Sequence, residues 1–253
     1  MKSEPEIKEK VSDMYYHKSL LKQLVDAKSA KVILELGVRT IVGDGLGETS
    51  THMFYEALAS RDRLTAPALY SCDLEMPQHA YPWVEILKRS PIWQFFHGDT
   101  REQFELIKEM LEERSQKVDI LFIDTDKTYE LTKYELSNYP KLLSDTGVIL
   151  LHDVGIDWDF NNVRRPGKKY PNAEEWEGHD KAIMEFLEDT DFKMTAQLGS
   201  YNMAVLYRDD SHIDGVKLED LPYDNNRQSM SPPLVRKRRE RFNRRWKAYK
   251  LSQ

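Results

Sequence analysis

Short apolar runs separated by helical patterns recur along most of the chain. Runs typical of strands lie at residues 32–36, 68–73, 93–97, 119–124, 148–152, 192–197 and 203–207. The amphipathic stretches between the first five runs predict βα units, and hence a mainly parallel sheet with helices on both faces. The last two runs are separated only by residues around Gly199, which predicts a terminal antiparallel hairpin. The sequence therefore predicts an α/β fold with a seven-stranded, mostly parallel sheet.

The same pattern predicts three segments along the chain. Residues 1–29 form an N-terminal helical cover, with an amphipathic helix at 12–28, and residues 30–209 form the main domain. Within that domain, residues 155–180 interrupt the alternation after a strand and are interpreted as a lid. Residues 210–253 form a polar connector followed by a basic helical tail.

Two local helix starts can also be predicted. Between residues 100 and 115, apolar side chains recur on one helical face, and Thr100 with Gln103 fits a capping box at the start of that helix. A later helix is predicted at 180–187, with His179 and Asp180 at its beginning, where they could act as a cap.

Composition narrows the functional classes. No apolar run is long enough for a membrane helix, and the charged start of the chain lacks the apolar core of a signal peptide. The single cysteine, Cys72, excludes an internal disulfide and a cysteine-rich zinc site. These features predict a cytoplasmic protein without membrane contact.

The charge is distributed unevenly. Residues 236–250 hold nine Lys and Arg against one acid, so the rest of the chain carries a formal charge of about −14. A body this acidic argues against nucleic acid as the main partner. The basic tail is interpreted as a solvated helix or as an arm that packs on the acidic body of a second subunit, which predicts a homodimer or another homo-oligomer.

Polar residues follow the first three strand-like runs, at the edge of a parallel sheet where ligands bind. Gly37 follows the first run, and a glycine-rich stretch at 43–50 opens a helix whose amides suit a carboxylate or phosphate. Asp73 ends the second run, where it can accept hydrogen bonds from ribose hydroxyls. Asp99 follows the third and can accept one from an adenine amino group. Each acid could equally cap a helix, but together they favour a nucleoside site.

A second polar group follows the fourth and fifth runs. Asp124 ends the fourth run, and His152 with Asp153 ends the fifth, so adjacent parallel strands would bring the three side chains together. Two carboxylates and one imidazole suit Mg²⁺ or a similar divalent cation. Such an ion would bind the oxygen of a substrate hydroxyl. It would hold that oxygen in place and lower the pKa of the hydroxyl.

These strand ends resemble class I S-adenosylmethionine-dependent methyltransferases. The resemblance covers about residues 30–207 and rests on E-L-G-V-R at 35–39, the acid at Asp73, G-D-T at 98–100, F-I-D-x-D-x-x-Y-E at 122–130 and L-L-H-D-V at 150–154. It is strongest for metal-dependent small-molecule O-methyltransferases of the catechol and macrolide-sugar types and for cephalosporin-hydroxylase-like relatives. It implies a Rossmann-like fold, S-adenosyl-L-methionine as cofactor, and a hydroxyl of a sugar, natural product or catechol as acceptor.

The resemblance also implies roles for individual residues. The residues it places at the cofactor are Glu35 and Gly37 at the methionine part, Asp73 at the ribose, Asp99 at the adenine, and Arg39 and Asp124 nearby. Metal-dependent members carry a ligand Asp after strand four, a base three residues later and two adjacent ligands after strand five. Those positions are Asp124, Lys127, and His152 with Asp153. A lysine beside a dication is pushed toward its neutral form, so Lys127 would act as general base.

Several alternatives stay open at this point. The family usually carries Asp or Glu where this chain has His152, so His152 could itself be the base, oriented by Asp153 without a metal. Both residues could also be simple structural caps. A nicotinamide oxidoreductase would place G-x-G-x-x-G directly after the first strand, where this chain does not have it. A non-catalytic cofactor-binding module could use the basic tail for a partner.

Overall fold

The computed structural model describes residues 21, 24–26, 29–38, 49–60, 67–76, 82–154, 173–197 and 203–208. Several predicted features lie outside these residues: Arg39, the glycine-rich stretch at 43–48, most of the N-terminal helix, the 155–172 part of the lid and the basic tail. Within the described ranges, no helix is long and apolar enough to cross a membrane.

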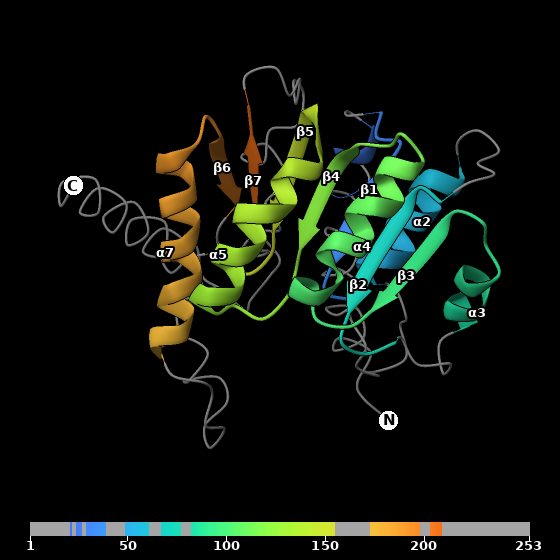
Figure 1. The fold of residues 1–253 in the computed structure, drawn as a ribbon, viewed down its shortest axis with the longest axis horizontal. Helices are drawn as coiled ribbons and strands as arrows, with labels where there is room; N and C mark the ends of the chain where they lie inside the picture. Colours follow the sequence, from blue (N-terminus) through green and yellow to red (C-terminus); the bar gives the residue numbers. More distant parts are fainter. Residues whose placement is uncertain are drawn as a thin grey trace, which may run out of the picture.

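One sheet of seven strands organises the part of the chain that the structure describes (Figure 1). The strand order is β3-β2-β1-β4-β5-β7-β6. The bounds are β1 Ile33–Leu36, β2 Leu69–Asp73, β3 Trp93–His97, β4 Val118–Ile123, β5 Leu143–Leu151, β6 Lys193–Gln197 and β7 Met203–Tyr207. The first five strands are parallel, whereas β7 runs antiparallel to both β5 and β6. The predicted fold class is confirmed, including the antiparallel pair at the end.

Helices cover both faces of this sheet, as the alternating pattern predicts. Their bounds are α2 Ser50–Ala59, α3 Pro82–Lys88, α4 Thr100–Glu113, α5 Tyr129–Asn138, the 3-10 turn η1 Tyr139–Leu142 and α7 Ala173–Asp189. Buried residues of α2 and α3 join one apolar cluster, and buried residues of α4, α5 and α7 join the other. Figure 1 shows α4, α5 and α7 side by side in front of the strands, with α2 behind them.

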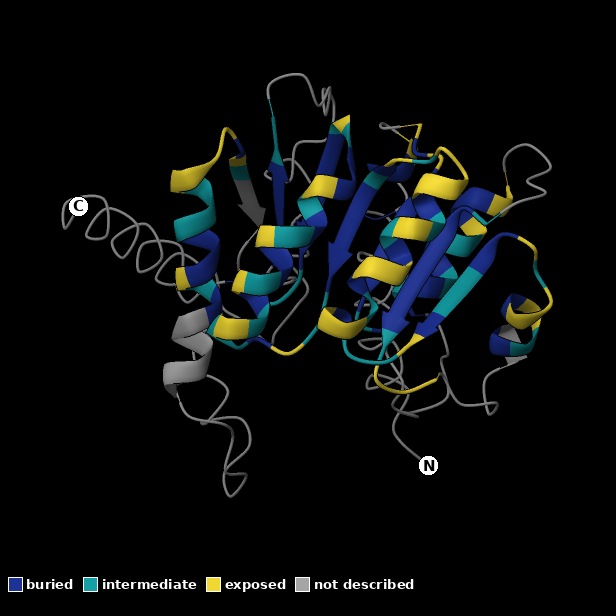
Figure 2. Ribbon diagram, viewed as in Figure 1, coloured by how far each residue is buried: buried dark blue, intermediate teal, exposed yellow. Residues whose placement is uncertain are grey.

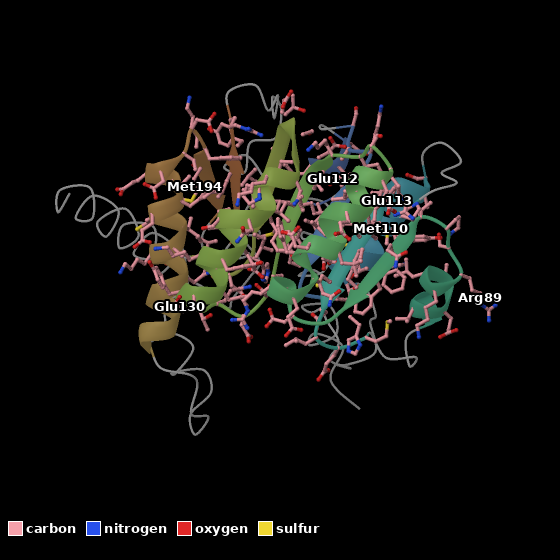
Figure 3. The ribbon with its side chains drawn as sticks, in the orientation of Figure 1. Arg89, Met110, Glu112, Glu113, Glu130 and Met194 are labelled. Carbon is pink, nitrogen blue, oxygen red and sulfur yellow. The ribbon has the colours of Figure 1, made fainter. Side chains whose placement is uncertain are left out.

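Alternation along the strands creates the two layers of the core. Ile33 packs with the cluster under α2, and the next residue, Leu34, packs with the cluster under α4, because successive side chains of a strand point to opposite faces. The central strands are therefore buried on both sides and appear almost entirely dark blue in Figure 2. Charged side chains such as Arg89, Glu112 and Glu130 are exposed and lie at the periphery (Figure 3).

The structure corrects the predicted start of α4. Asp99, not Thr100, is the N-cap, since its backbone is extended and its carboxylate accepts a hydrogen bond from the Arg101 amide. Thr100 is the first helical residue, and its hydroxyl donates to Glu135 instead of a backbone group. The capping-box prediction was wrong because Glu135, which lies 35 residues away, takes this hydroxyl.

Two other boundaries differ from the prediction. β5 begins at Leu143 rather than 148, because Leu143 pairs with Val118 ahead of a register shift in β4. Helix α7 begins at Ala173, so residues 173–180 are helical rather than part of a loop, and His179 lies inside the helix rather than at its start.

The packing of α2 on the sheet gives a direct test of the core. Phe54 is fully buried and contacts Phe122 of β4 edge to face, with ring centroids 5.6 Å apart. Phe54→Ala should lower the free energy of unfolding by about 3–5 kcal/mol, because the cavity left behind is enclosed on all sides. Leu106→Ala is the control, since Leu106 is 48% exposed. Equal urea midpoints for the two variants would contradict this packing.

Candidate functional site

The ends of the parallel strands surround one cavity of about 360 Å³, a size that suits a small ligand. Its wall includes six of the residues singled out in the sequence: Gly37, Asp73, Asp99, Asp124, Lys127 and Asp153. They come from the ends of β1, β2, β3, β4 and β5. The cavity therefore lies where a parallel sheet presents the carboxyl ends of its strands.

Gly37 allows the first and fourth strands to approach closely at the cavity. Its φ is +86°, and a Cβ placed there would lie 2.4 Å from the carbonyl oxygen of Asp124. The Asp124 amide in turn donates to the Leu36 carbonyl over 2.8 Å. Only glycine fits both the backbone conformation and this contact.

Asp73 fastens the loop after β1 to the end of β2. One of its carboxylate oxygens accepts from the Val38 amide over 2.6 Å, and the other accepts from the Glu75 amide over 2.9 Å. Burial raises the pKa of Asp73, although these amides oppose the shift. Each oxygen retains a lone pair, so the carboxylate can still accept from a ligand hydroxyl in the cavity.

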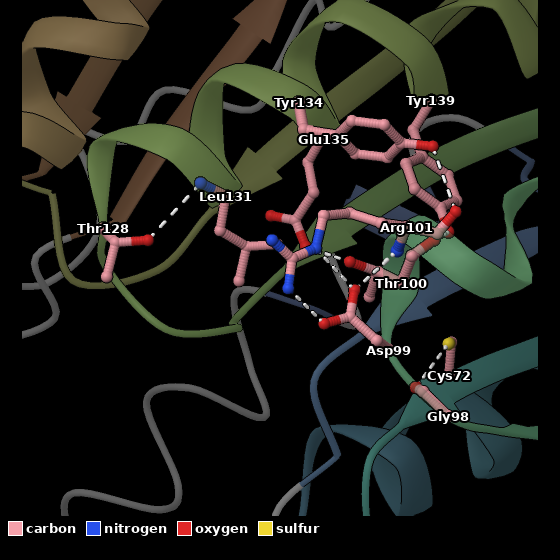
Figure 4. Close-up of polar contacts among 10 residues, drawn as sticks. All are labelled: Cys72, Gly98, Asp99, Thr100, Arg101, Thr128, Leu131, Tyr134, Glu135 and Tyr139. Carbon is pink, nitrogen blue, oxygen red and sulfur yellow. Dashed lines mark hydrogen bonds and ion pairs between the residues drawn. The ribbon is translucent and has the colours of Figure 1, made fainter.

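The carboxylate of Asp99 is paired with the guanidinium of Arg101 (Figure 4). Besides capping α4, its carboxylate accepts from the Arg101 guanidinium, with Nε 2.8 Å from Oδ1. Hydrogen bonds from Arg101 lower the pKa of Asp99. The carboxylate is therefore ionised and oriented at the cavity wall, and any contact with an adenine amino group would share it with Arg101.

Glu35 has a different position from the one expected for a cofactor contact. Its side chain is fully buried, it is not part of the cavity wall, and it accepts hydroxyl hydrogen bonds from Ser50, Thr51 and Ser71. Burial raises its pKa to about 7, although the hydroxyls oppose that shift. Glu35 thus ties β1 to β2 and to the first turn of α2 behind the cavity.

Asp124, His152 and Asp153 come together at the ends of β4 and β5. The ligand atoms that the three offer lie within 4.8 Å of one another. The Nδ1 atom of His152 is 3.0 Å from Asp124 Oδ1 and 3.2 Å from Asp153 Oδ2. Within the described ranges, no other cluster of acids, histidines or cysteines has this geometry.

The charges in this cluster support each other. Burial opposes charge on His152, but the carboxylates of Asp124 and Asp153 outweigh it and raise the pKa of His152 to about 10. Burial likewise opposes charge on Asp124, yet Lys127 and His152 hold the pKa of Asp124 below its usual range. The two carboxylates therefore favour the protonated form of the imidazole, and Lys127 adds a second positive charge beside Asp124.

The backbone of Asp153, within this cluster, has an unusual conformation. Asp153 has a φ of +62°, in the left-handed region that a non-glycine residue rarely adopts. This conformation turns the chain directly after His152, so that both side chains face Asp124. Such backbone strain is often found at functional sites.

Lys127 lies beside the cluster and is largely buried. Its Nζ donates to Asp124 Oδ1 over 3.1 Å and to the Thr125 carbonyl over 2.6 Å. The side chain also forms part of the cavity wall, together with Asp124 and Asp153.

Other polar residues near this edge were not predicted from the sequence. Glu135 is fully buried on α5 and binds the hydroxyls of Thr100 and Thr125, which both line the cavity. Glu135 lies on the buried side of α5 together with Thr132 and Leu136. His179 of α7 is buried and binds the Thr132 hydroxyl through Nδ1.

The chain is similar to known methyltransferases in part of its sequence and in its fold. A family model described as a methyltransferase domain matches residues 42–154. An O-methyltransferase from Bacillus cereus, solved with SAH, superposes with a TM-score of 0.51 at 16% identity, over 76% of this chain and 80% of that one. The cofactor-bound protein Rv0187 from MTB gives a TM-score of 0.50 at 14% identity, over 75% and 78%. Identities this low show a shared fold. No curated protein matches the chain by sequence.

The contact at Gly37 leads to a stability prediction. Gly37→Ala should destabilise the protein, because the φ of +86° costs about 1–3 kcal/mol for alanine and the new methyl collides with backbone. Gly98→Ala is the comparison, since its φ of +148° also strains an alanine but the nearest obstacle there is the flexible Gln103 side chain rather than backbone. A Gly37→Ala urea midpoint equal to that of the Gly98 variant would contradict the close approach of β1 and β4.

The buried carboxylate of Glu35 predicts a pH dependence. Because its pKa is raised from 4.5 to about 7 in the folded protein, ionisation disfavours the folded state. Stability should therefore fall as pH rises between these values and level off above pH 7 or so. Glu35→Gln should remove about 3 kcal/mol of that fall. Urea unfolding at several pH values measures it, with the exposed Glu109→Gln as control. An unchanged slope in Glu35→Gln would refute the assignment.

Proposed function

We propose that this chain is a class I S-adenosylmethionine-dependent methyltransferase that methylates a hydroxyl of a small molecule with help from a divalent metal. The methyltransferase-domain match over residues 42–154 and the shared fold support this proposal. The acceptor class is a sugar, a natural product or a catechol-like compound. Gly37, Asp73 and Asp99 would contact the cofactor, together with Arg39 and Asp124. Glu35 would support this wall from behind rather than touch the cofactor.

The cluster of Asp124, His152 and Asp153 is the observation that carries this proposal. Its ligand atoms lie within 4.8 Å of one another beside the cavity, and their oxygen and imidazole donors suit Mg²⁺ or a similar ion. A divalent cation bound there would supply Lewis-acid chemistry by binding the acceptor oxygen and lowering the pKa of its hydroxyl. The two carboxylates already converge on a positive charge, that of His152.

Lys127 is the base in this proposal. The acceptor oxygen forms a bond to the methyl carbon, the bond from that carbon to the sulfonium sulfur breaks, and the hydroxyl proton goes to Nζ of Lys127. The charge of a bound dication would favour the neutral amine that this step needs. The hydrogen bond from Nζ to Asp124 and the place of Lys127 in the cavity wall support this role. Asp124 orients the amine, and the Thr125 carbonyl provides a second acceptor for its protons.

The metal-free alternative, with His152 as base, is less well supported. Asp124 and Asp153 raise the pKa of His152 to about 10 despite its burial, so the imidazole is protonated at neutral pH. A protonated imidazole has no lone pair to accept the hydroxyl proton. His152 therefore suits the metal site better, where it would bind as the neutral ring.

We also propose a homodimer in which the basic tail of one subunit packs on the acidic body of the other. The charge asymmetry supports this arrangement, since residues 236–250 hold nine Lys and Arg while the rest of the chain carries about −14.

Calorimetric titration with Mg²⁺, S-adenosylmethionine and S-adenosylhomocysteine (SAH) tests the proposed function. The wild type should bind cofactor at micromolar concentration and should show a separate Mg²⁺ site. Asp153→Asn should weaken Mg²⁺ binding by at least about tenfold, because it removes an anionic ligand. Asparagine tolerates the left-handed backbone at this position, so the fold should be kept.

Asp145→Asn is the matched control, since Asp145 is exposed at the other end of β5. Loss of methyl transfer to a panel of catechols and glycosides should follow the loss of Mg²⁺ in Asp153→Asn. Cofactor binding without any Mg²⁺ site would refute the metal role and return His152 to consideration. Absence of cofactor binding would overturn the proposed function as a whole.

A further inference from the structure

A buried carboxylate on α5 joins two separate parts of the cavity wall. Glu135 is fully buried, and each of its two oxygens accepts a hydrogen bond from a different threonine. Oε1 accepts from the Thr100 hydroxyl over 2.9 Å, and Oε2 accepts from the Thr125 hydroxyl over 2.8 Å. Both threonines line the cavity.

The two threonines follow different strands. Thr100 begins α4, directly after the turn that ends β3, whereas Thr125 follows the end of β4. β2 and β1 lie between β3 and β4 in the sheet, so no strand pairing links these two ends. Glu135 therefore bridges the cavity wall across the positions where β1 and β2 deliver Gly37 and Asp73.

Two tyrosines next to Glu135 hold the same turn of α4 (Figure 4). The Tyr139 hydroxyl donates to the Thr100 carbonyl over 2.6 Å, and the Tyr134 hydroxyl donates to the Arg101 carbonyl over 3.1 Å. These contacts fix the backbone of α4, and Glu135 fixes the Thr100 side chain. The start of α4 is thus held by three side chains from α5 and η1, among which only Glu135 also reaches the loop after β4.

Chemistry explains why a carboxylate at this place restricts the threonines. Both oxygens of Glu135 accept and both hydroxyls donate, so each threonine side chain is held in one rotamer. Folding alone does not require an acid here, because burial disfavours its charge and raises the pKa of Glu135 to about 7. An apolar residue would avoid this cost but would leave both threonine hydroxyls without their acceptor.

We propose that Glu135 is a positioning residue for the cofactor, holding the walls after β3 and β4 at a fixed separation on either side of Gly37 and Asp73, where the proposed function places the cofactor. The inference rests on the proposed function, which assigns this part of the cavity to S-adenosylmethionine. Glu135 does not touch the cofactor itself, and it acts through Thr100 and Thr125.

SAH binding to the purified full chain tests this role with two variants at the same position. Glu135→Leu removes both acceptors and should weaken SAH binding by about fivefold to tenfold, the loss expected for one to two buried hydrogen bonds. Glu135→Gln keeps the shape and one acceptor oxygen, while its amide can donate to the second hydroxyl, so it should restore most of the affinity.

Asp119→Asn is the matched control. Asp119 is also a bridging carboxylate, which accepts from the Lys31 and Val32 amides and from the Ser144 hydroxyl. It lies near the start of β4, at the opposite end of the strand from the cavity. This variant should lower the melting temperature without changing the SAH dissociation constant. Methyl-threonine NMR adds a direct signal, since the Thr100 and Thr125 methyl resonances should show rotamer averaging in Glu135→Leu and not in Asp119→Asn.

The possible outcomes distinguish failure of the positioning role of Glu135 from failure of the proposed function. Weaker SAH binding in Glu135→Leu, with recovery in Glu135→Gln and averaged threonine signals, supports positioning. Wild-type affinity in a folded Glu135→Leu, or an equal loss in Asp119→Asn, overturns positioning alone. A wild-type protein that binds no SAH overturns the proposed function, and the positioning role with it.

Discussion

The close approach of β1 and β4 at Gly37 is the constraint on which the site depends. Because a side chain at this point would meet the Asp124 backbone, the two strand ends can lie side by side only with glycine there. The Asp124 amide bonds the Leu36 carbonyl, and the His152 amide bonds the Ile123 carbonyl, so the same edge continues to β5. The cavity and the carboxylate cluster are consequences of this alignment.

Buried carboxylates stabilise the edge in two different ways. Glu35 and Glu135 are surrounded by hydroxyls, which satisfy their oxygens without supplying a positive charge, and both have a raised pKa. Asp124 is instead paired with Lys127 and His152, and its pKa is lowered. Hydroxyl partners thus mark the supporting positions, whereas cationic partners mark the centre where we propose the chemistry to take place.

In the proposed function, the cofactor and the acceptor would occupy different sides of the cavity, in the order of the strands. Asp73 and Asp99 lie on the β2 and β3 side of the cavity, and Asp153 lies on the β5 side, with Gly37 and Asp124 between them. A cofactor bound across β1 to β3 would direct its methyl group toward β4 and β5. This arrangement would bring the methyl donor, the proposed metal and Lys127 into one place without any movement of the sheet.

The sequence alone determined the class of fold and the residues at the strand ends. Alternating apolar runs identified all seven strands of the described sheet, because burial on both faces demands apolar residues there. The methyltransferase-domain match over residues 42–154 agrees with the resemblance of the strand-end motifs in that range, and six of the expected site residues do meet at one cavity. Parallel strands made that meeting predictable, since their carboxyl ends share an edge.

Only the tertiary structure decided which atom each polar group meets. Thr100 was expected to cap a helix and Glu35 to face a ligand, yet Glu135 takes the hydroxyl of Thr100 and three hydroxyls surround Glu35. The pairing of Asp99 with Arg101 and the left-handed backbone of Asp153 were equally outside the pattern. Hydropathy gives the side of an element that faces inward. Hydrogen-bond partners that lie far apart in sequence depend on distances that exist only after the helices have packed on the sheet.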